Sequence, residues 1–425
     1  MDRTLQPPIL PMEQIVIPEP EHLLMPNGVQ LHYLNIGNED VVRVDVIVRS
    51  GKWDAARSLE TDFTGLMLKE GAANLNSAQI AEKLDYYGAW FQTYTTQQCS
   101  YLTLYSLNKF FDETLVVLEA MVKEPSFPEK EFDILRQNRK SRFSVDMDKV
   151  QYLAAKEFIR VLFGKNHPYG RSVGKEDFDT LSVSDTVGYY TNHYHSGNIE
   201  IAAFGKITGK MLTQIEHCFG KTAWGKQSPK TKQSSIIQPA KEKRKLIVKP
   251  GAVQSAVCVG KQIITRDHPD FHALSVLNTI FGGYFGSRLM SNIREDKGYT
   301  YGIYSSVTSH LHAGYLNILT QTGHEQVESV IKEIFMEMDK LAETLVPENE
   351  LQIVRNYMLG ELARKFDNPF AVADIYLSLS EFGLERDFYE KRIDRIKNIT
   401  SEDIRELARR YFTKEDFYEV IAGNG

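Results

Sequence analysis

The stretch that decides the fold is Pro128-Glu-Lys-Glu-Phe-Asp-Ile-Leu-Arg-Gln137, because the chain repeats it as Pro347-Glu-Asn-Glu-Leu-Gln-Ile-Val-Arg-Asn356. The two copies lie 219 residues apart (347 − 128). In each copy the proline fits the first turn of a helix, and the acidic residues that follow suit a helix N-terminus. A helix repeated at this spacing predicts two similar halves in a chain of 425 residues.

A second pair of landmarks keeps nearly the same spacing. Ser182-x-x-Asp185 and Thr400-x-x-Asp403 lie 218 residues apart (400 − 182), and both are typical of a helix N-cap with an acid at the third position. Each predicts a helix followed by a short apolar strand that ends in glycine, Gly205 in the first half and Gly423 in the second. The order and spacing of the landmarks support a duplicated architecture.

Earlier in each half the pattern has a period of two. Val42-Arg43-Val44-Asp45-Val46 alternates apolar with polar residues and predicts a half-buried strand, with residues 253–259 as its counterpart. Residues 94–107 and 299–320 each read as a pair of strands. We therefore predict an α+β fold of two similar domains, each with helices packed on one face of a mixed or antiparallel sheet.

The segment between the halves is rich in Lys, Ser and Pro and poor in apolar residues. It predicts a linker at residues 226–245, between a first domain at 1–225 and a second at 246–425. Its basic cluster, Lys-Glu-Lys-Arg-Lys at 241–245, could contact nucleic acid, but we interpret it as a solvated linker.

Composition excludes several classes of protein. Lys plus Arg number 50 against 56 Asp plus Glu, and this net charge of −6 argues against a nucleic-acid partner. No apolar run approaches the ~18 residues of a membrane span, and we see no signal peptide. The chain has 3 cysteines, widely spaced, which we expect to be buried thiols in a reducing compartment. The expectation is a cytoplasmic protein without a membrane partner.

Several passages resemble the signatures of one family, the pitrilysin/insulinase-type zinc metallopeptidases, which include the mitochondrial processing peptidase. The passages are Asn27-Gly-Val-Gln-Leu31, Asn166-His-Pro-Tyr-Gly170, Phe281-Gly-Gly283, Ser287-Arg-Leu289 and Arg294-Glu-Asp-Lys-Gly-Tyr-Thr-Tyr301. The resemblance covers nearly the whole chain. It implies that the two domains together form half of a clamshell.

Active members of that family carry His-x-x-Glu-His on a helix of the first half, where the two histidines bind zinc and the glutamate acts on the water. By position the motif falls on residues 62–66. Asp62 stands in place of the first histidine, Gly65 in place of the glutamate and Leu66 in place of the second histidine. Of these three positions only Asp62 is a residue type that can bind a metal, and the general base is missing.

The third zinc ligand of the family, a glutamate, should lie on the helix that begins near Pro128. Residues 134–145 contain no Asp or Glu, and four of the twelve are cationic: Arg136, Arg139, Lys140 and Arg142. A cationic face repels a metal ion. His268 with His272, and His193 with His195, lack a suitable carboxylate, and we interpret the latter pair as surface residues. The sequence thus predicts no bound metal and no peptidase activity of the chain alone.

The second-half signature is retained. In the resembled family an Arg and a Tyr at the spacing of Arg294 and Tyr301 face the zinc site and contact the carbonyl oxygen of the substrate. Arginine and tyrosine can both donate to an oxyanion. The alternative is structural: Arg294 pairs with Glu295 or Asp296, and Tyr301 is a core strand residue.

The resemblance implies a zinc-less subunit of a two-chain metallopeptidase. A homologous subunit would bring the zinc, and this chain would contribute Arg294, Tyr301 and a chamber wall to the hydrolysis of a peptide. The peptide would add to a sheet edge, which we place at residues 92–96. The alternative is a non-catalytic scaffold or peptide-binding protein of the same ancestry. A homodimer is possible for the chain alone, and an autonomous zinc peptidase is opposed by residues 62–66 and 134–145.

Overall fold

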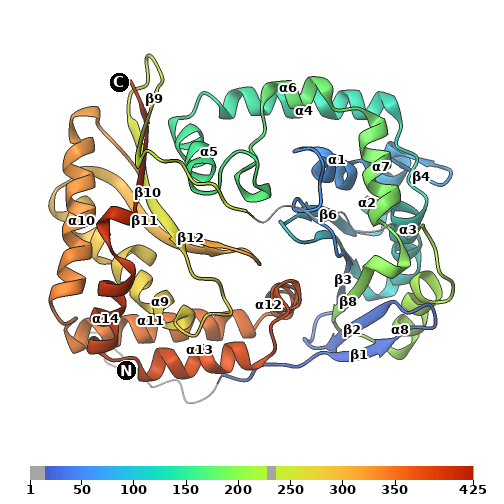
Figure 1. Cartoon of the computed structure of the whole chain (residues 1–425). Coiled ribbons are helices and arrows are strands. Elements are labelled where there is room, and N and C mark those ends of the chain that lie inside the picture. The colour runs from blue at the N-terminus through green and yellow to red at the C-terminus, as the bar shows by residue number, and fades with distance from the viewer. Residues whose placement is uncertain (1–14, 227–235, 425) are drawn as a thin grey trace, which may run out of the picture.

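The computed structural model describes residues 15–226 and 236–424. They form two sheets, each with its own helices, which stand side by side in Figure 1 with the first half at the right and the second at the left. Among these residues no helix combines the length and the apolar character needed to cross a bilayer.

The sheet of the first half has six strands in the order β1-β2-β8-β3-β7-β6. The pair β2–β8 is parallel and the other pairs are antiparallel. The strands are β1 (Glu21–Leu24), β2 (Gln30–Asn35), β3 (Val41–Val48), β6 (Trp90–Thr95), β7 (Ser100–Leu107) and β8 (Ile199–Gly205), and a separate hairpin joins β4 (Gly71–Ala72) to β5 (Leu75–Asn76).

The sheet of the second half has five strands in the order β11-β12-β10-β13-β9, again with one parallel pair, β13–β9. Its strands are β9 (Arg244–Val248), β10 (Ser255–Ile263), β11 (Thr300–Ser309), β12 (Gly314–Thr322) and β13 (Tyr418–Gly423). Once β1 is set aside, the two sheets have the same strand order and the same parallel pair. The α+β fold with a repeated mixed sheet is therefore confirmed.

Each half contributes several helices, most of which cover one face of the sheet of that half. In the first half they are α1 (Glu60–Met67), α2 (Ser77–Tyr86), α3 (Phe111–Lys123), α4 (Glu129–Asp146), α5 (Val150–Phe163), α6 (Lys175–Thr180), α7 (Val183–His193) and α8 (Gly209–Ile215). In the second half they are α9 (Phe271–Asn278), α10 (Val327–Glu343), α11 (Glu348–Phe366), α12 (Pro369–Phe382), α13 (Asp387–Asn398) and α14 (Ser401–Tyr411).

The described residues also contain eight short 3₁₀ or π turns. They are η1 (Asn108–Phe110), η2 (Pro168–Gly170), η3 (Ser196–Asn198), η4 (Glu216–Gly220), η5 (Thr279–Gly283), η6 (Met290–Asp296), η7 (His324–Gln326) and η8 (Lys414–Asp416).

The repeated sequence landmarks begin equivalent helices. Pro128 and Pro347 each lie one residue before the first residue of α4 and α11, rather than inside the first turn. Ser182 and Thr400 each cap a helix: the hydroxyl of Ser182 accepts from the N–H of Asp185, and that of Thr400 from the N–H of Asp403 at 3.1 Å. Both predicted capping boxes are confirmed.

The second face of each sheet receives a helix from the opposite half. Helix α5, of the first half, packs Ala154 and Phe158 against Cys258 and Val420 of the second sheet. Helix α12, of the second half, packs against Ile47, Tyr101, Ala202 and Phe204 of the first sheet through Ala373 and Leu377. Figure 1 shows α12 between the two halves, in contact with the helices of the second half on one side and facing the first sheet on the other. The two halves therefore exchange one helix each.

This exchange corrects the prediction of a half-buried strand at residues 42–46. From Val42 to Val48 every residue of β3 is buried, because α12 covers the face on which Arg43 and Asp45 lie. The Arg43 guanidinium donates to both carboxylate oxygens of Asp45, at 2.8 and 3.1 Å, and reaches α12 through Asp374. A charged pair thus replaces solvent on the polar side of this strand.

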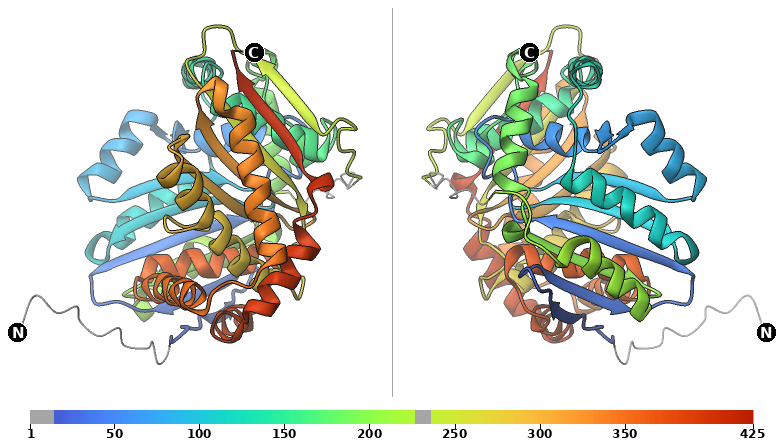
Figure 2. Two further views of the ribbon diagram at one scale, coloured as in Figure 1. Left: turned by 90° about the vertical axis from the view of Figure 1, so that its left-hand side faces the viewer. Right: turned by 90° about the vertical axis from the view of Figure 1, so that its right-hand side faces the viewer.

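The predicted linker at 226–245 falls partly outside the described residues, which omit 227–235. Strand β9 begins at Arg244, so the last two residues of the predicted linker already belong to the second sheet. The domain limits 1–225 and 246–425 otherwise stay predictions. The side views in Figure 2 show β9 as an outer strand beside β13.

Candidate functional site

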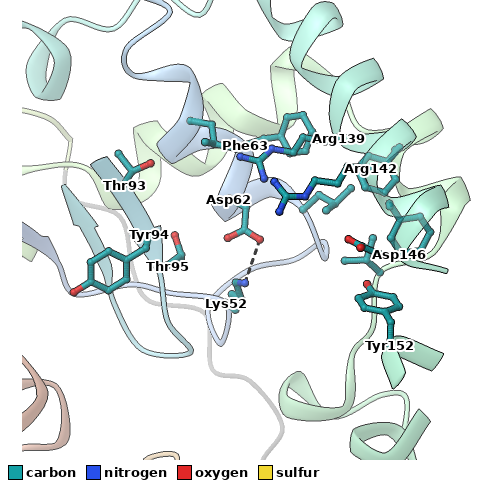
Figure 3. A pocket seen from close by; sticks show the side chains of 15 residues that line it. Lys52, Asp62, Phe63, Thr93, Tyr94, Thr95, Arg139, Arg142, Asp146 and Tyr152 are labelled. Carbon is teal, nitrogen blue, oxygen red and sulfur yellow. Dashed lines mark ion pairs between the residues drawn. The ribbon is translucent and has the colours of Figure 1, made fainter. Parts of the chain in front are cut away.

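A cavity of about 510 Å³ opens beside α1, where the sequence places the lost zinc motif. Its walls come from α1, β6, α4 and the residues around Lys52 and Tyr152, all in the first half. Figure 3 shows Asp62 near the centre of this cavity, with the side chains of Arg139 and Arg142 reaching towards it from α4. We call it the motif cavity.

The amphipathic character of α1 decides which residues face this cavity. Met67 is buried in the core of the first half, Phe63 lies between that core and the cavity, and Asp62 and Leu66 line the cavity beside it. Gly65 packs against β6: a Cβ there would lie 3.5 Å from the Thr93 hydroxyl, an ordinary contact. Residues 62–66, onto which the resemblance maps the zinc motif, therefore lie on one helix beside a sheet edge, and their assignment as a degenerate motif stays a prediction.

The carboxylates of the motif cavity are paired and two of its arginines are not. Lys52 Nζ lies 3.1 Å from Asp62 Oδ2, and Lys149 Nζ donates to Asp146 Oδ1 at 2.7 Å. Within residues 15–226 and 236–424, Arg139 and Arg142 have no ion pair or hydrogen bond through their side chains. Two guanidinium groups are thus free to receive a carboxylate, which arginine binds in a bidentate manner.

These residues do not fit zinc. A three-ligand zinc site needs imidazole, thiolate or carboxylate donors. The cavity offers two carboxylates, Asp62 and Asp146, each already paired with a lysine, beside Leu66 and two arginines. Across the described part of the chain no group of three or more His, Cys, Asp or Glu is placed to hold a metal ion. The charges of Arg139 and Arg142 oppose the binding of a divalent cation in this cavity.

The other histidine pairs lie elsewhere in the fold. His272 packs against the ring of Phe388 at 4.5 Å, and burial, with the neighbouring Arg392, lowers its pKa to about 4. His195 is buried, which corrects the prediction that both histidines of the 193–195 pair are surface residues. Its Cα and Cβ are covered by the loop at Gly225. The three cysteines are buried free thiols, as predicted.

The strand β6 gives the motif cavity an open edge. It is an outer strand of the first sheet and, among the described strands, pairs only with β7. Thr93 and Thr95 line the cavity, so its free edge runs past Asp62 (Figure 3). This confirms that residues 92–95 form a sheet edge, while the role as a peptide-binding edge stays a prediction.

The retained arginine and tyrosine lie outside the motif cavity. The Arg294 guanidinium, in η6, lies over the ring of Phe285 at 4.7 Å from its centroid and makes no ion pair with Glu295 or Asp296 among the described residues. Tyr301 lies near the start of β11, the outer strand of the second sheet, and is 92% exposed. The structural alternative, a core tyrosine and a surface ion pair, does not describe these two side chains.

Sequence reasoning identified the arginines of α4 but missed Lys52. Arg139 and Arg142 are three residues apart and so share a helix face, which the sequence alone shows. Lys52 follows the end of β3, and nothing in the local sequence points it towards Asp62. The pairing depends on how the turn after β3 meets α1, which is a tertiary contact.

Comparisons with known proteins agree with this geometry. Residues 180–358 match the family model described as the peptidase M16 inactive domain. The uncharacterized zinc protease YmxG of Bacillus subtilis is 24% identical over 413 residues, covering 94% of this chain and 97% of that protein. The Helicobacter pylori protein named non-peptidase homolog YmxG is 20% identical over 365 residues, 84% of this chain and 83% of that protein.

The fold is shared with a solved structure. A crystal structure described as a peptidase M16 inactive domain, from Pseudomonas fluorescens, superposes with a TM-score of 0.84 over 96% of this chain and 98% of that one, at 22% identity. The family model, the full-length relatives and the fold converge on one assignment. Residues 180–358 match the inactive domain of the peptidase M16 family, and the whole chain is similar in sequence to proteins named zinc proteases and in fold to a protein that carries that description.

Proposed function

We propose that this chain is the zinc-less subunit of a two-chain M16-type metallopeptidase. A homologous subunit brings the zinc, and this chain supplies a chamber wall and the side chains of Arg294 and Tyr301. The observation that carries the proposal is the combination of a motif cavity unfit for zinc with an intact second-half signature, whose Tyr301 is exposed and whose Arg294 lacks a carboxylate partner among the described residues.

The first half takes part by holding the peptide. An extended substrate adds to the free edge of β6, and an acidic side chain or terminus of that substrate pairs with Arg139 and Arg142 in the motif cavity. Backbone hydrogen bonds supply affinity and the arginines supply selectivity. Three buried free thiols support a reducing compartment, so we place the pair in the cytoplasm.

The test is a native pull-down of the full chain followed by a cleavage assay of whatever pair is recovered. A single stoichiometric partner with an intact His-x-x-Glu-His supports the proposal. In the pair, Arg294→Ala with Tyr301→Phe should slow peptide cleavage without affecting assembly. Arg288→Ala and Lys297→Ala are poor controls, because Arg288 is paired with Glu350 and Lys297 with Glu333. Asp296→Ala, exposed in the same segment and without an ion pair among the described residues, is the better one.

A second function is a scaffold or peptide-binding protein with no catalytic partner, on its own or as a homodimer. It is favoured by one observation: Arg294 and Tyr301 do not line the motif cavity of their own chain. Recovery of a large unrelated assembly, or of the chain alone, would support it. Cleavage by the double variant at the parent rate would do the same.

A further inference from the structure

A second cavity, of about 440 Å³, lies between α9, α12 and α13, on elements other than those of the motif cavity. Figure 1 shows these three helices close together below the second sheet. Three cationic side chains line it: Arg266 follows β10, Lys365 lies near the end of α11, and Arg392 is in α13. We call it the cationic cavity.

None of the three cations has a carboxylate partner among the described residues. Arg392 makes no hydrogen bond or ion pair there, and its Nε is buried without a partner. Lys365 is likewise unpaired in that part of the chain. Arg266 donates to the Ser378 hydroxyl at 2.7 Å and lies over the Phe382 ring, 4.2 Å from its centroid.

The one acidic residue that lines the cationic cavity is committed elsewhere. Asp374 accepts from Arg43 at 2.8 Å, and its side chain is 67% exposed. The lining of the cavity therefore carries three cations against one carboxylate, and none of the three is ion-paired within the described residues.

Such an arrangement is unfavourable without a ligand. Burial lowers the pKa of Arg266, Lys365 and Arg392, and repulsion between the cations lowers the pKa of Lys365 and Arg392 further. Unpaired cations in a desolvated site destabilise a fold unless a counter-charge compensates them. A bound anion would supply that charge.

The remaining lining suits a small polar ligand. The hydroxyls of Ser378 and Tyr389 stand among the cations, and Phe271, Ile375 and Phe388 form a buried apolar wall. Arginine and lysine together are the residues that bind phosphate oxygens, the former in a bidentate manner. Three cations exceed the charge of a single carboxylate and match a doubly charged group.

We propose that the cationic cavity is a binding site for a phosphate group, either inorganic phosphate or the phosphate of a small metabolite, held by Arg266, Lys365 and Arg392. This site does not depend on the peptidase role proposed above. The ligand contacts α12, the helix that crosses to the first sheet, and so fixes its position against α9 and α13.

The test is thermal unfolding of the full chain with inorganic phosphate, against sodium chloride of equal ionic strength, with dissociation constants from calorimetry. We expect phosphate, and not chloride, to raise the unfolding temperature. Arg392→Met and Lys365→Met should each weaken phosphate binding by about tenfold or more, since each removes one charge-assisted contact. Lys365 is exposed, so its variant remains informative where Arg392→Met fails to fold.

The matched control is Arg364→Met, the neighbouring cation on α11, which donates to Glu361 at 2.7 Å and does not line the cavity. It should bind phosphate as the parent does. Glycerol phosphate is a second probe: tighter binding than inorganic phosphate identifies a metabolite as the ligand, and equal binding identifies free phosphate. Equal stabilisation by phosphate and chloride, or unchanged phosphate affinity in both cavity variants, overturns the proposal.

Discussion

Arg43 in β3 and Asp374 in α12 lie 331 positions apart, yet Arg43 Nη1 donates to Asp374 Oδ1 at 2.8 Å. The same nitrogen donates to the carbonyl of Phe370 at 3.1 Å. Arg43 is 1% exposed, and its other nitrogens hold the buried carboxylate of Asp45. One guanidinium thus joins the interior of the first sheet to a helix of the second half.

Arg43→Met should destabilise the fold by about 3–5 kcal/mol, because it leaves Asp45 charged and buried without its partner. Asp374→Asn should reduce stability by no more than about 1 kcal/mol, because Asp374 is largely exposed. Urea unfolding measures both. The double variant Arg43→Met with Asp45→Val should recover part of the loss, and equal losses from the two single variants would contradict this account.

Restoring the residues of the zinc motif alone should not restore zinc binding. Asp62→His, Gly65→Glu and Leu66→His together rebuild the helix part, and Gly65 has room for a side chain beside Thr93. Arg139 and Arg142 would still repel the ion. Metal analysis should find little zinc in the triple variant and more once both arginines are replaced by glutamate. Near-stoichiometric zinc in the parent chain would show that the motif cavity is misread.

The motif cavity should prefer acidic peptides. The double variant Arg139→Gln with Arg142→Gln should weaken the binding of an extended peptide that carries one Glu by about tenfold. It should weaken the binding of a neutral peptide far less. Fluorescence anisotropy at two salt concentrations measures this, and the preference should fall at high salt. Lys130→Gln with Lys140→Gln is the charge-matched control on α4, since neither residue lines the cavity. Equal losses in both double variants would exclude a specific carboxylate site.

Acid should loosen the contact between α12 and the first sheet. Arg49 donates to Glu200 at 2.8 Å and to the Ser380 carbonyl at 3.1 Å. Burial alone would raise the pKa of Glu200, but the nearby His32 ring, 3.4 Å away, and hydrogen bonds from Arg49 lower it to about 2. A lowered folded-state pKa gives stability that is complete above the unfolded value of about 4.3 and is lost as pH falls towards 2.

Glu200→Gln should therefore lower stability by at most about 3 kcal/mol at pH 7, and the difference from the parent should shrink between about pH 5 and pH 3. Denaturant unfolding across this range measures it. Glu295→Gln, on the exposed end of η6, is the control and should show no such convergence. If the difference in unfolding free energy between Glu200→Gln and the parent stayed constant at every pH, Glu200 would not be the source of this pH dependence.

Local signals predicted much of the fold. The capping boxes at Ser182 and Thr400 and the repeated prolines depend on contacts within one turn of helix, so the sequence alone locates them. The helix exchange depends on contacts between the halves. The alternation at Val42–Val46 correctly separates two faces of β3, but a period of two says nothing about what covers the second face.

The features of the candidate site also fall into those that the sequence predicts and those that depend on tertiary contacts. The absence of zinc-ligand types at Gly65 and Leu66 is a matter of residue type and is read from the sequence, while the assignment of Asp62, Gly65 and Leu66 to a former zinc motif stays a prediction. Other contacts join segments that are distant in sequence, so no local pattern predicts them. They are the pairing of Lys52 with Asp62 and the cluster of Arg266, Lys365 and Arg392. The roles of Arg294 and Tyr301 stay predictions, because they concern a partner.

The crossing of α12 also sets an order of events during synthesis. The first sheet is complete in sequence at Gly205, but the helix that covers Ile47 and Phe204 ends at Phe382. At the usual rates of translation the ribosome needs roughly ten to forty seconds to make the intervening chain. Throughout that interval the nascent first half leaves Ile47 and Phe204 uncovered beside the Arg43–Asp45 pair, which gives chaperones at the ribosome exit an apolar surface to bind.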